Sequence, residues 1–108
     1  MMGYKYLDLE LVRAFVSAAQ KLKVSEVARS PRGFLRAYRT ADGNPQLLSD
    51  KWDEKRAAFI KRSMAAVKKR KEPLWVKGVP TRRHLALIMW AYSPTAKKLA
   101  KYSWPWLR

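Results

Sequence analysis

The sequence contains no cysteine and a single histidine, His84. A chain without thiols forms neither a disulfide nor a thiolate zinc site, and one histidine without cysteine partners excludes the usual zinc-finger spacings. Negative charge is also scarce, because only 8 of the 108 residues are Asp or Glu. Since so few carboxylates make a poor metal site, we expect neither a metal ion nor another cofactor.

Two further absences, of membrane or secretory segments and of catalytic motifs, exclude further classes of protein. No apolar run approaches the roughly 18 residues needed to cross a bilayer, and residues 1–10 lack the basic start and apolar core of a secretory signal. We therefore expect an intracellular, cytoplasmic protein that makes no membrane contact. The sequence also has no glycine-rich phosphate loop and supports no serine–histidine–carboxylate arrangement. We accordingly expect His84 to be a surface or packing residue and the protein not to be an enzyme.

What the sequence has in excess is positive charge. It carries 24 Lys and Arg, which gives a formal net charge of +16. A surface this basic needs a polyanionic partner or tolerates constant self-repulsion. Residues 49–71 alone hold nine basic and three acidic side chains, and residues 72–108 hold seven and one. Nucleic acid is therefore the first candidate partner, with DNA expected over RNA.

The spacing of apolar residues predicts an all-α protein. We expect a single small domain over residues 1–108, folded as a compact bundle of four to six short helices with an aromatic C-terminal tail at residues 103–108. No segment alternates convincingly as a strand, residues 40–45 should form an exposed loop, and residues 74–80 should be irregular. Cap and proline signals place the helices at residues 6–22, 25–28, from Ser30-Pro31 onward, from Ser49 or Asp50 to about residue 71, from Thr81, and from Ser93-Pro94 to residue 102.

The long helix expected over residues 49–71 carries its cations on one side. Its apolar residues share the opposite side, and Glu72-Pro73 should end it. Several cations on one helix face give salt-sensitive, largely sequence-independent affinity for phosphates. A solvated face, with cations favoured at the C-terminal end by the helix dipole, explains the same pattern. The residues that we expect to contact the phosphate backbone are Lys51, Lys55, Lys61, Arg62, Lys68, Lys69 and Arg70.

Two smaller groups of arginines are further candidates. Arg82 and Arg83 begin the helix capped by Thr81, which should continue through Tyr92, and a helix N-terminus favours an anion. The alternative is ordinary capping with solvated arginines. A second patch of Arg32, Arg36 and Arg39 lies on the helix that starts at Ser30-Pro31, in a weak helix-turn-helix pattern. That motif usually has glycine in its turn, whereas here Gly33 is expected inside the helix. Two packed helices joined by a capped turn, with their arginines in solvent, fit this pattern better.

The C-terminal tryptophans leave two interpretations open. We expect Trp90 to be buried, because Ile88, Met89 and Tyr92 flank it. Trp104 and Trp106 either fold back over the core or form an interface with another protein or with unpaired bases.

Two segments carry a resemblance to known proteins. VSEVARSPRGFLRAY at residues 24–38 and LSDKWDEKRAAFIKR at residues 48–62 resemble small basic uncharacterised proteins of bacteriophages and other DNA viruses. The resemblance implies a viral setting and a location in the virion or the host cytoplasm. Proteins of this kind coat or condense DNA, bind inside a virion, or attach to a host machine.

The sequence therefore predicts a small, basic nucleic-acid-binding protein that contacts the phosphate backbone. The alternative is a protein-interaction module, either a virion component or a modulator of a host enzyme. It would bind an acidic protein surface through the basic helix, Trp104 and Trp106. A subunit of a larger assembly is a third interpretation.

Overall fold

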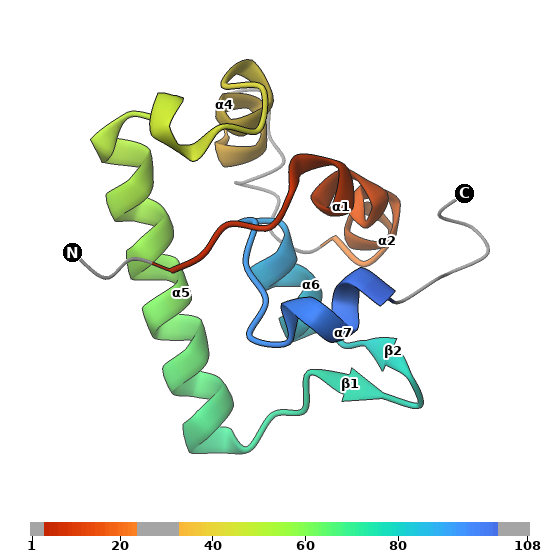
Figure 1. The fold of residues 1–108 in the computed structure, drawn as a ribbon. Coiled ribbons are helices and arrows are strands. Elements are labelled where there is room, and N and C mark those ends of the chain that lie inside the picture. Colours follow the sequence, from red (N-terminus) through yellow and green to blue (C-terminus); the bar gives the residue numbers. More distant parts are fainter. Residues whose placement is uncertain (1–3, 24–32, 102–108) are drawn as a thin grey trace.

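The computed structural model describes residues 4–23 and 33–101. Some of the expected features lie outside the described residues. These are the short helix at residues 25–28 and the side chains of Arg32, Trp104 and Trp106. The described part is mostly helical, as predicted, with six α-helices and one small sheet (Figure 1). Its elements are α1 (Leu9–Ala14), α2 (Val16–Lys21), α4 (Phe34–Thr40), the 3-10 helix η1 (Pro45–Leu47), α5 (Asp50–Arg70), β1 (Trp75–Val76), β2 (Val79–Pro80), α6 (Arg82–Ile88) and α7 (Ala96–Lys101).

The first helical segment is broken where the sequence predicts one continuous helix. Phe15 separates α1 from α2, and its N–H donates to the carbonyl of Val12, three residues back, at 3.0 Å. This tighter turn ends α1, while the carbonyl of Phe15 accepts from Ala19 and begins α2. Because Phe15 itself is fully buried, the break sits in the core rather than at the surface.

Gly33 precedes α4 instead of lying inside it. Its backbone is extended, with ψ at −175°, so it forms the N-cap, and its carbonyl accepts the first bond of the helix from Ala37. α4 then buries Phe34 and Leu35, as well as Tyr38, whose hydroxyl donates to the carbonyl of Leu7 at 2.8 Å.

Aromatic rings fill the space between α4, α5 and the end of α6. Phe34 stacks on Trp90 with ring centroids 5.2 Å apart and meets Trp52 edge-on at 6.2 Å. Phe59 covers Trp90 from α5 at 5.2 Å. The burial expected for Trp90 is confirmed, since only 6% of it is exposed.

The connection from α4 to α5 is a turn, as predicted. Asp42 and Gly43 both have positive φ, and the Asn44 side chain accepts from the N–H of Gln46 at the start of η1. A Cβ on Gly43 would lie 3.0 Å from Cβ of Leu9, so glycine is required here by both φ and space.

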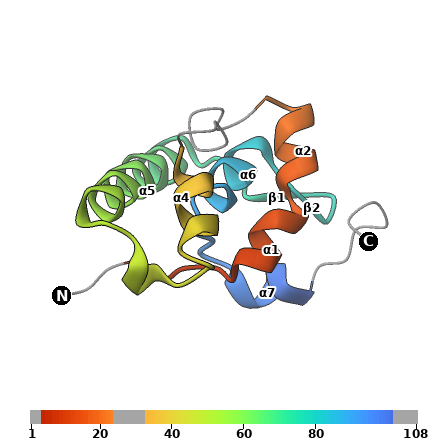
Figure 2. The same ribbon diagram turned by 90° about the horizontal axis from the view of Figure 1, so that it is seen from above.

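α5 is the longest helix and forms one edge of the molecule in both ribbon views (Figures 1 and 2). The Ser49 hydroxyl caps its first turn by accepting from the N–H of Trp52. The helix ends at Arg70, because Lys71 turns left-handed (φ 54°) and the N–H of Glu72 closes back on the carbonyl of Val67. The expected stop at Glu72-Pro73 is therefore made just before the proline.

The segment expected to be irregular contains a small hairpin. β1 pairs antiparallel with β2, with Val76 opposite Val79. The two turn residues, Lys77 and Gly78, both have positive φ, which is the backbone of a two-residue hairpin turn. Local turn geometry, not an alternating pattern, makes these strands.

α6 is capped by Thr81, as predicted, but is shorter than expected. Its last helical residue is Ile88, and Ala91 turns left-handed (φ 58°), so Tyr92 lies beyond the helix rather than on it. α7 follows at Ala96, later than the Ser93-Pro94 start expected from the sequence.

Candidate nucleic-acid interface

The structure places every cation expected on the long helix at an exposed position. α5 turns its buried residues, Arg56, Ile60 and Ser63, toward the rest of the protein. The exposed cations are Lys51, Lys55, Lys61, Arg62, Lys68, Lys69 and Arg70. The helix thus brings together the whole basic group along about 30 Å of its length.

These cations have little internal compensation. Arg70 lies 3.9 Å from a carboxylate oxygen of Glu72, and Nζ of Lys55 lies 5.2 Å from the centre of the Trp52 ring. In the described part of the chain, no carboxylate reaches ion-pair distance of Lys61, Arg62, Lys68 or Lys69. Their charges are therefore available to a polyanion.

The acidic residues of α5 are confined to its beginning. Asp50, Asp53 and Glu54 occupy the first turns, whereas residues 55–71 contain eight basic side chains and no acidic one. Asp53 accepts a hydrogen bond from the Tyr6 hydroxyl at 2.7 Å. Burial, together with this bond, raises the pKa of Tyr6 to about 12, so the tyrosine stays neutral and adds no negative charge beside the helix.

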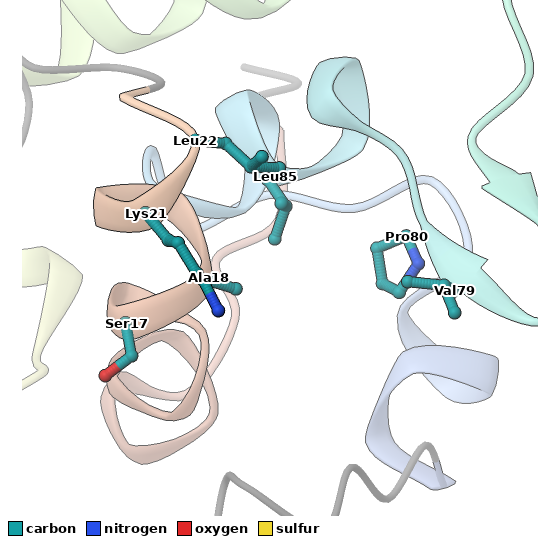
Figure 3. A pocket seen from close by; sticks show the side chains of 7 residues that line it. All are labelled: Ser17, Ala18, Lys21, Leu22, Val79, Pro80 and Leu85. Atoms are coloured by element: carbon teal, nitrogen blue, oxygen red, sulfur yellow. The ribbon is translucent and has the colours of Figure 1, made fainter.

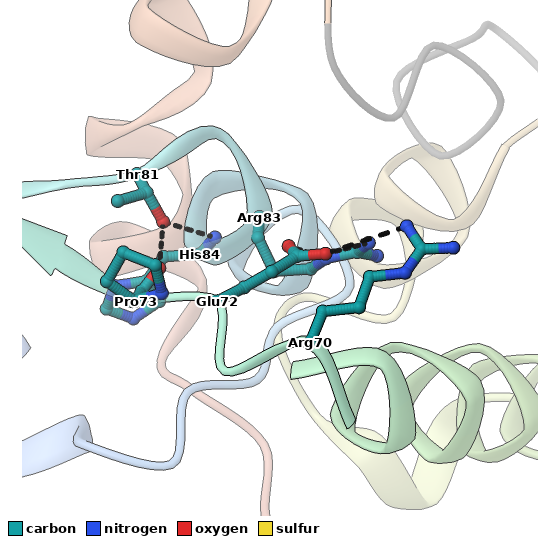
Figure 4. Close-up of polar contacts among 6 residues, drawn as sticks. All are labelled: Arg70, Glu72, Pro73, Thr81, Arg83 and His84. Atoms are coloured by element: carbon teal, nitrogen blue, oxygen red, sulfur yellow. Dashed lines mark hydrogen bonds and ion pairs between the residues drawn. The ribbon is translucent and has the colours of Figure 1, made fainter. Parts of the chain in front are cut away.

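Arg82 and Arg83, expected as a second anchor, are engaged within the protein. Arg83 forms two hydrogen bonds to the Glu72 carboxylate, at 2.9 and 3.2 Å, which hold α6 against the end of α5 (Figure 4). This contact raises the pKa of Arg83 and lowers that of Glu72, since each charge stabilises the other. Arg82 donates to the carbonyl of Leu22. Neither guanidinium is as free as the cations of α5.

Arg36 and Arg39, from the expected second patch, are exposed on α4. Their helix lies beside the N-terminal end of α5 (Figures 1 and 2), where the acidic residues of α5 are. They therefore do not extend the row of cations that runs toward residue 71.

Arg56 is a key residue that the sequence analysis missed. It is 1% exposed, and its guanidinium donates to four backbone carbonyls: Trp90 at 2.7 Å, Tyr4 at 2.9 Å, Lys5 at 2.6 Å and Ala91 at 2.9 Å. Burial lowers its pKa, but arginine remains charged in proteins.

The Tyr6 ring covers the guanidinium of Arg56, with the central carbon 3.6 Å from the ring centre. Arg56 thus fastens α5 to the segment before α1 and to the turn after α6. One signal existed in the sequence, because position 56 falls in the middle of the apolar side of the helix.

His84, expected to be a surface or packing residue, is a buried packing residue whose hydrogen bonds the sequence did not indicate. It is fully buried, with Nδ1 3.0 Å from the Leu74 carbonyl and Nε2 2.7 Å from the Ser93 hydroxyl. A carbonyl only accepts, so Nδ1 carries the proton and Nε2 accepts from Ser93. The Ser93 oxygen in turn accepts from the N–H of Thr95.

Although this contact pairs a serine with a histidine, it is a structural hydrogen bond and not a catalytic pair. Burial, with a smaller effect of nearby Lys98, lowers the pKa of His84 to about 4, which makes it a poor general base at neutral pH. The residue orienting its ring is a neutral carbonyl rather than a carboxylate, and the support that this carbonyl gives an imidazolium is outweighed by burial. The pair joins the start of α6 to the hairpin and to the turn before α7.

Two open cavities lie away from α5. The first, of about 540 Å³, is mainly apolar and lies between α2, β2 and α6 (Figure 3); its lining consists of Ser17, Ala18, Lys21, Leu22, Val79, Pro80 and Leu85. The second, of about 490 Å³, lies beside the turn before α7 and includes Tyr4, Lys5, Tyr92 and Ser93. Neither contains a cluster of titratable groups comparable to the α5 face.

Within residues 4–23 and 33–101, no three His, Asp or Glu side chains group closely enough to hold a metal ion. In the same part of the chain, no helix is both long enough and apolar enough to span a membrane. Comparison of the chain with protein-family models, with curated proteins and with solved structures finds no match.

Proposed function

We propose that this protein binds nucleic acid through the phosphate backbone, using the exposed face of α5. The observation that carries the proposal is the uncompensated charge of that face: Lys61, Arg62, Lys68 and Lys69 are exposed and have no carboxylate within ion-pair distance in the described structure. Cations that bind phosphates release condensed counterions, and the affinity gained is largely independent of sequence.

The helix is also held firmly enough to present this face as a unit. Arg56 and Ile60 anchor its inner side, and the Glu72–Arg83 ion pair fixes its end against α6. Because the backbone position of the cations is set before binding, a polyanion orders only their side chains, which lowers the entropic cost of association.

Binding to labelled DNA and RNA over a salt series tests the proposal. Neutralising four cations should reduce the slope of log K against log salt by about 3 to 4 for duplex DNA and weaken binding at least about a hundredfold at physiological salt. The test variant carries Lys61→Gln, Arg62→Gln, Lys68→Gln and Lys69→Gln.

A control variant removes the same charge elsewhere, from exposed positions outside α5: Arg13→Gln, Lys21→Gln, Lys77→Gln and Lys97→Gln. Net charge alone would make the two variants equal, whereas the proposal requires the α5 variant to lose far more affinity. A folded wild-type protein that binds no nucleic acid at physiological salt would overturn the proposal.

The second candidate is the protein-interaction module, whose partner would present an acidic surface to α5 and an apolar surface to the cavity between α2, β2 and α6. One observation favours it: Leu22 and Val79 remain 45% and 39% exposed beside the larger cavity, as apolar contact residues of an interface would be. Leu22→Ser with Val79→Ser separates the two functions, because it should abolish capture of a protein partner and leave the affinity for nucleic acid unchanged. The viral setting implied by the resemblance belongs to both candidates.

A further inference from the structure

We propose that α5 enters the major groove of double-stranded DNA and places cations on both groove walls. The inference rests on the proposed phosphate-binding function and names its substrate class. It comes from how the exposed cations are distributed around the helix.

Five of the seven exposed cations of α5 form two rows. Lys55, Arg62 and Lys69 repeat every seven residues and make one row, while Lys61 and Lys68 make the other. Seven residues are nearly two turns, so members of a row lie about 10.5 Å apart along the axis. Because neighbouring residues are separated by about 100°, the two rows run parallel and flank a strip of helix surface between them.

The strip between the rows carries small side chains. Ala58 and Ala65 occupy it, about 40–60° from either row, and both are exposed. On the helical wheel this strip lies opposite the buried residues Arg56, Ile60 and Ser63, so it is the part of α5 farthest from the rest of the protein. Between Lys55 and Lys69, no side chain larger than alanine holds this strip away from a partner, and the exposed Glu54 lies at the N-terminal end of the strip.

A duplex groove matches this arrangement, because it offers phosphates on two sides of a central channel. The major groove of B-form DNA is about 12 Å wide and 8.5 Å deep and admits an α-helix. Residues 55–69 extend over about 21 Å, long enough to follow the groove with each row toward one strand. A flat acidic protein surface or a single strand would have no second wall for the second row.

Double-stranded RNA is the informative comparison. It carries the same kind of phosphate charge, but its major groove is deep, narrow and closed to side chains. α5 therefore reaches only one wall at a time on RNA. We expect the wild-type protein to bind a 20-base-pair DNA duplex at least about tenfold more tightly than the matching RNA duplex, since fewer cations reach phosphates on the RNA.

The decisive variant is Ala58→Leu with Ala65→Leu, which widens the strip without changing charge. Leucine favours helix, so α5 should persist, and circular dichroism checks this. The two leucines should hold α5 farther from the floor of the groove, so the cations of one row lose their contacts with phosphates. Binding to the DNA duplex should therefore weaken about tenfold, with a salt slope smaller by about 2, while RNA binding stays unchanged. Ala96→Leu, at an exposed position of α7, is the control and should alter neither.

Competition supplies an independent readout. Methyl green, a major-groove ligand, should be displaced from DNA by the protein, whereas netropsin, a minor-groove ligand, should remain bound. Equal affinity for both duplexes, insensitivity to the alanine substitutions, or displacement of netropsin instead would each overturn groove entry. Groove entry could fail while the variant with Lys61, Arg62, Lys68 and Lys69 replaced by Gln still loses its affinity for DNA. Phosphate binding by α5 would then be supported and only groove entry would be rejected. If the wild-type protein bound no polyanion at all, both proposals would be rejected.

Discussion

The buried His84 should make the stability of this protein fall sharply between pH 7 and pH 5. In the folded protein its pKa is about 4, below the ordinary histidine value of 6.5 that applies to the unfolded chain. Below pH 6.5 the unfolded chain therefore binds a proton that the folded protein does not. Stability must then decrease as the pH falls from 6.5 toward 4.

The size of the effect follows from the two pKa values. Each tenfold difference in proton affinity is worth about 1.4 kcal/mol, so the full loss approaches about 3 kcal/mol near pH 4. At pH 5, where the unfolded chain is almost fully protonated at this group, the loss is already about 2 kcal/mol. A small domain has only about 5–15 kcal/mol of stability, so the change is readily measured.

Urea unfolding followed by circular dichroism at pH 7, 6 and 5 measures this dependence. His84 is the only histidine, and ordinary carboxylates titrate below this window, so no other side chain should contribute a comparable change. His84→Gln is the control and should be equally stable at pH 7 and pH 5, whatever its overall stability.

Proton NMR of the single histidine provides a second measurement that does not depend on a variant folding. The ring signals of the folded protein should not titrate until the pH nears 4. A titration midpoint near pH 6.5 for His84 in the folded protein would refute its buried hydrogen bonds to Leu74 and Ser93. A wild-type stability that is the same at pH 7 and pH 5 would refute them as well.

Three further predictions concern other residues of the fold. Arg56→Lys should cost about 3 kcal/mol or more in urea unfolding, because one ammonium cannot satisfy the carbonyls that the guanidinium now reaches; a loss below about 1 kcal/mol would contradict its anchoring role. Gly43→Ala should cost about 2 kcal/mol, from positive φ together with crowding against Leu9, whereas Gly78→Ala, with open space around it, should cost only about 1 kcal/mol; equal losses in urea unfolding would show that the crowding does not matter. Lys77→Asn should raise the thermal midpoint slightly, because asparagine tolerates the left-handed turn better than lysine, and a lower midpoint would argue against the hairpin turn.

The sequence predicts α5 well, because its signals are local. Ser49 supplies the cap, the apolar residues repeat at helical spacing, and the cations occupy the opposite side. A candidate interface on one helix face needs nothing beyond that periodicity. The exposure of Lys61 and Arg62 could therefore be anticipated from the residues alone.

What could not be predicted depends on contacts between distant residues. The apolar spacing runs unbroken through Phe15, so it gives no sign that the backbone breaks there. Arg82 and Arg83 were expected to be free to bind a phosphate, because Leu22 and Glu72 become their partners only in the folded chain.

The four carbonyls around Arg56 also have a consequence for how the molecule folds. They lie between 34 and 52 residues from Arg56 along the chain, before α1 on one side and after α6 on the other. The guanidinium cannot leave water until both distant segments have arrived, although α5 itself can begin to wind from its local cap. Closure around Arg56 should therefore come late in folding, and its substitution should speed unfolding much more than it slows folding. Arg56, which is buried and cannot contact nucleic acid, would then determine the unfolding rate and hence the lifetime of the native state.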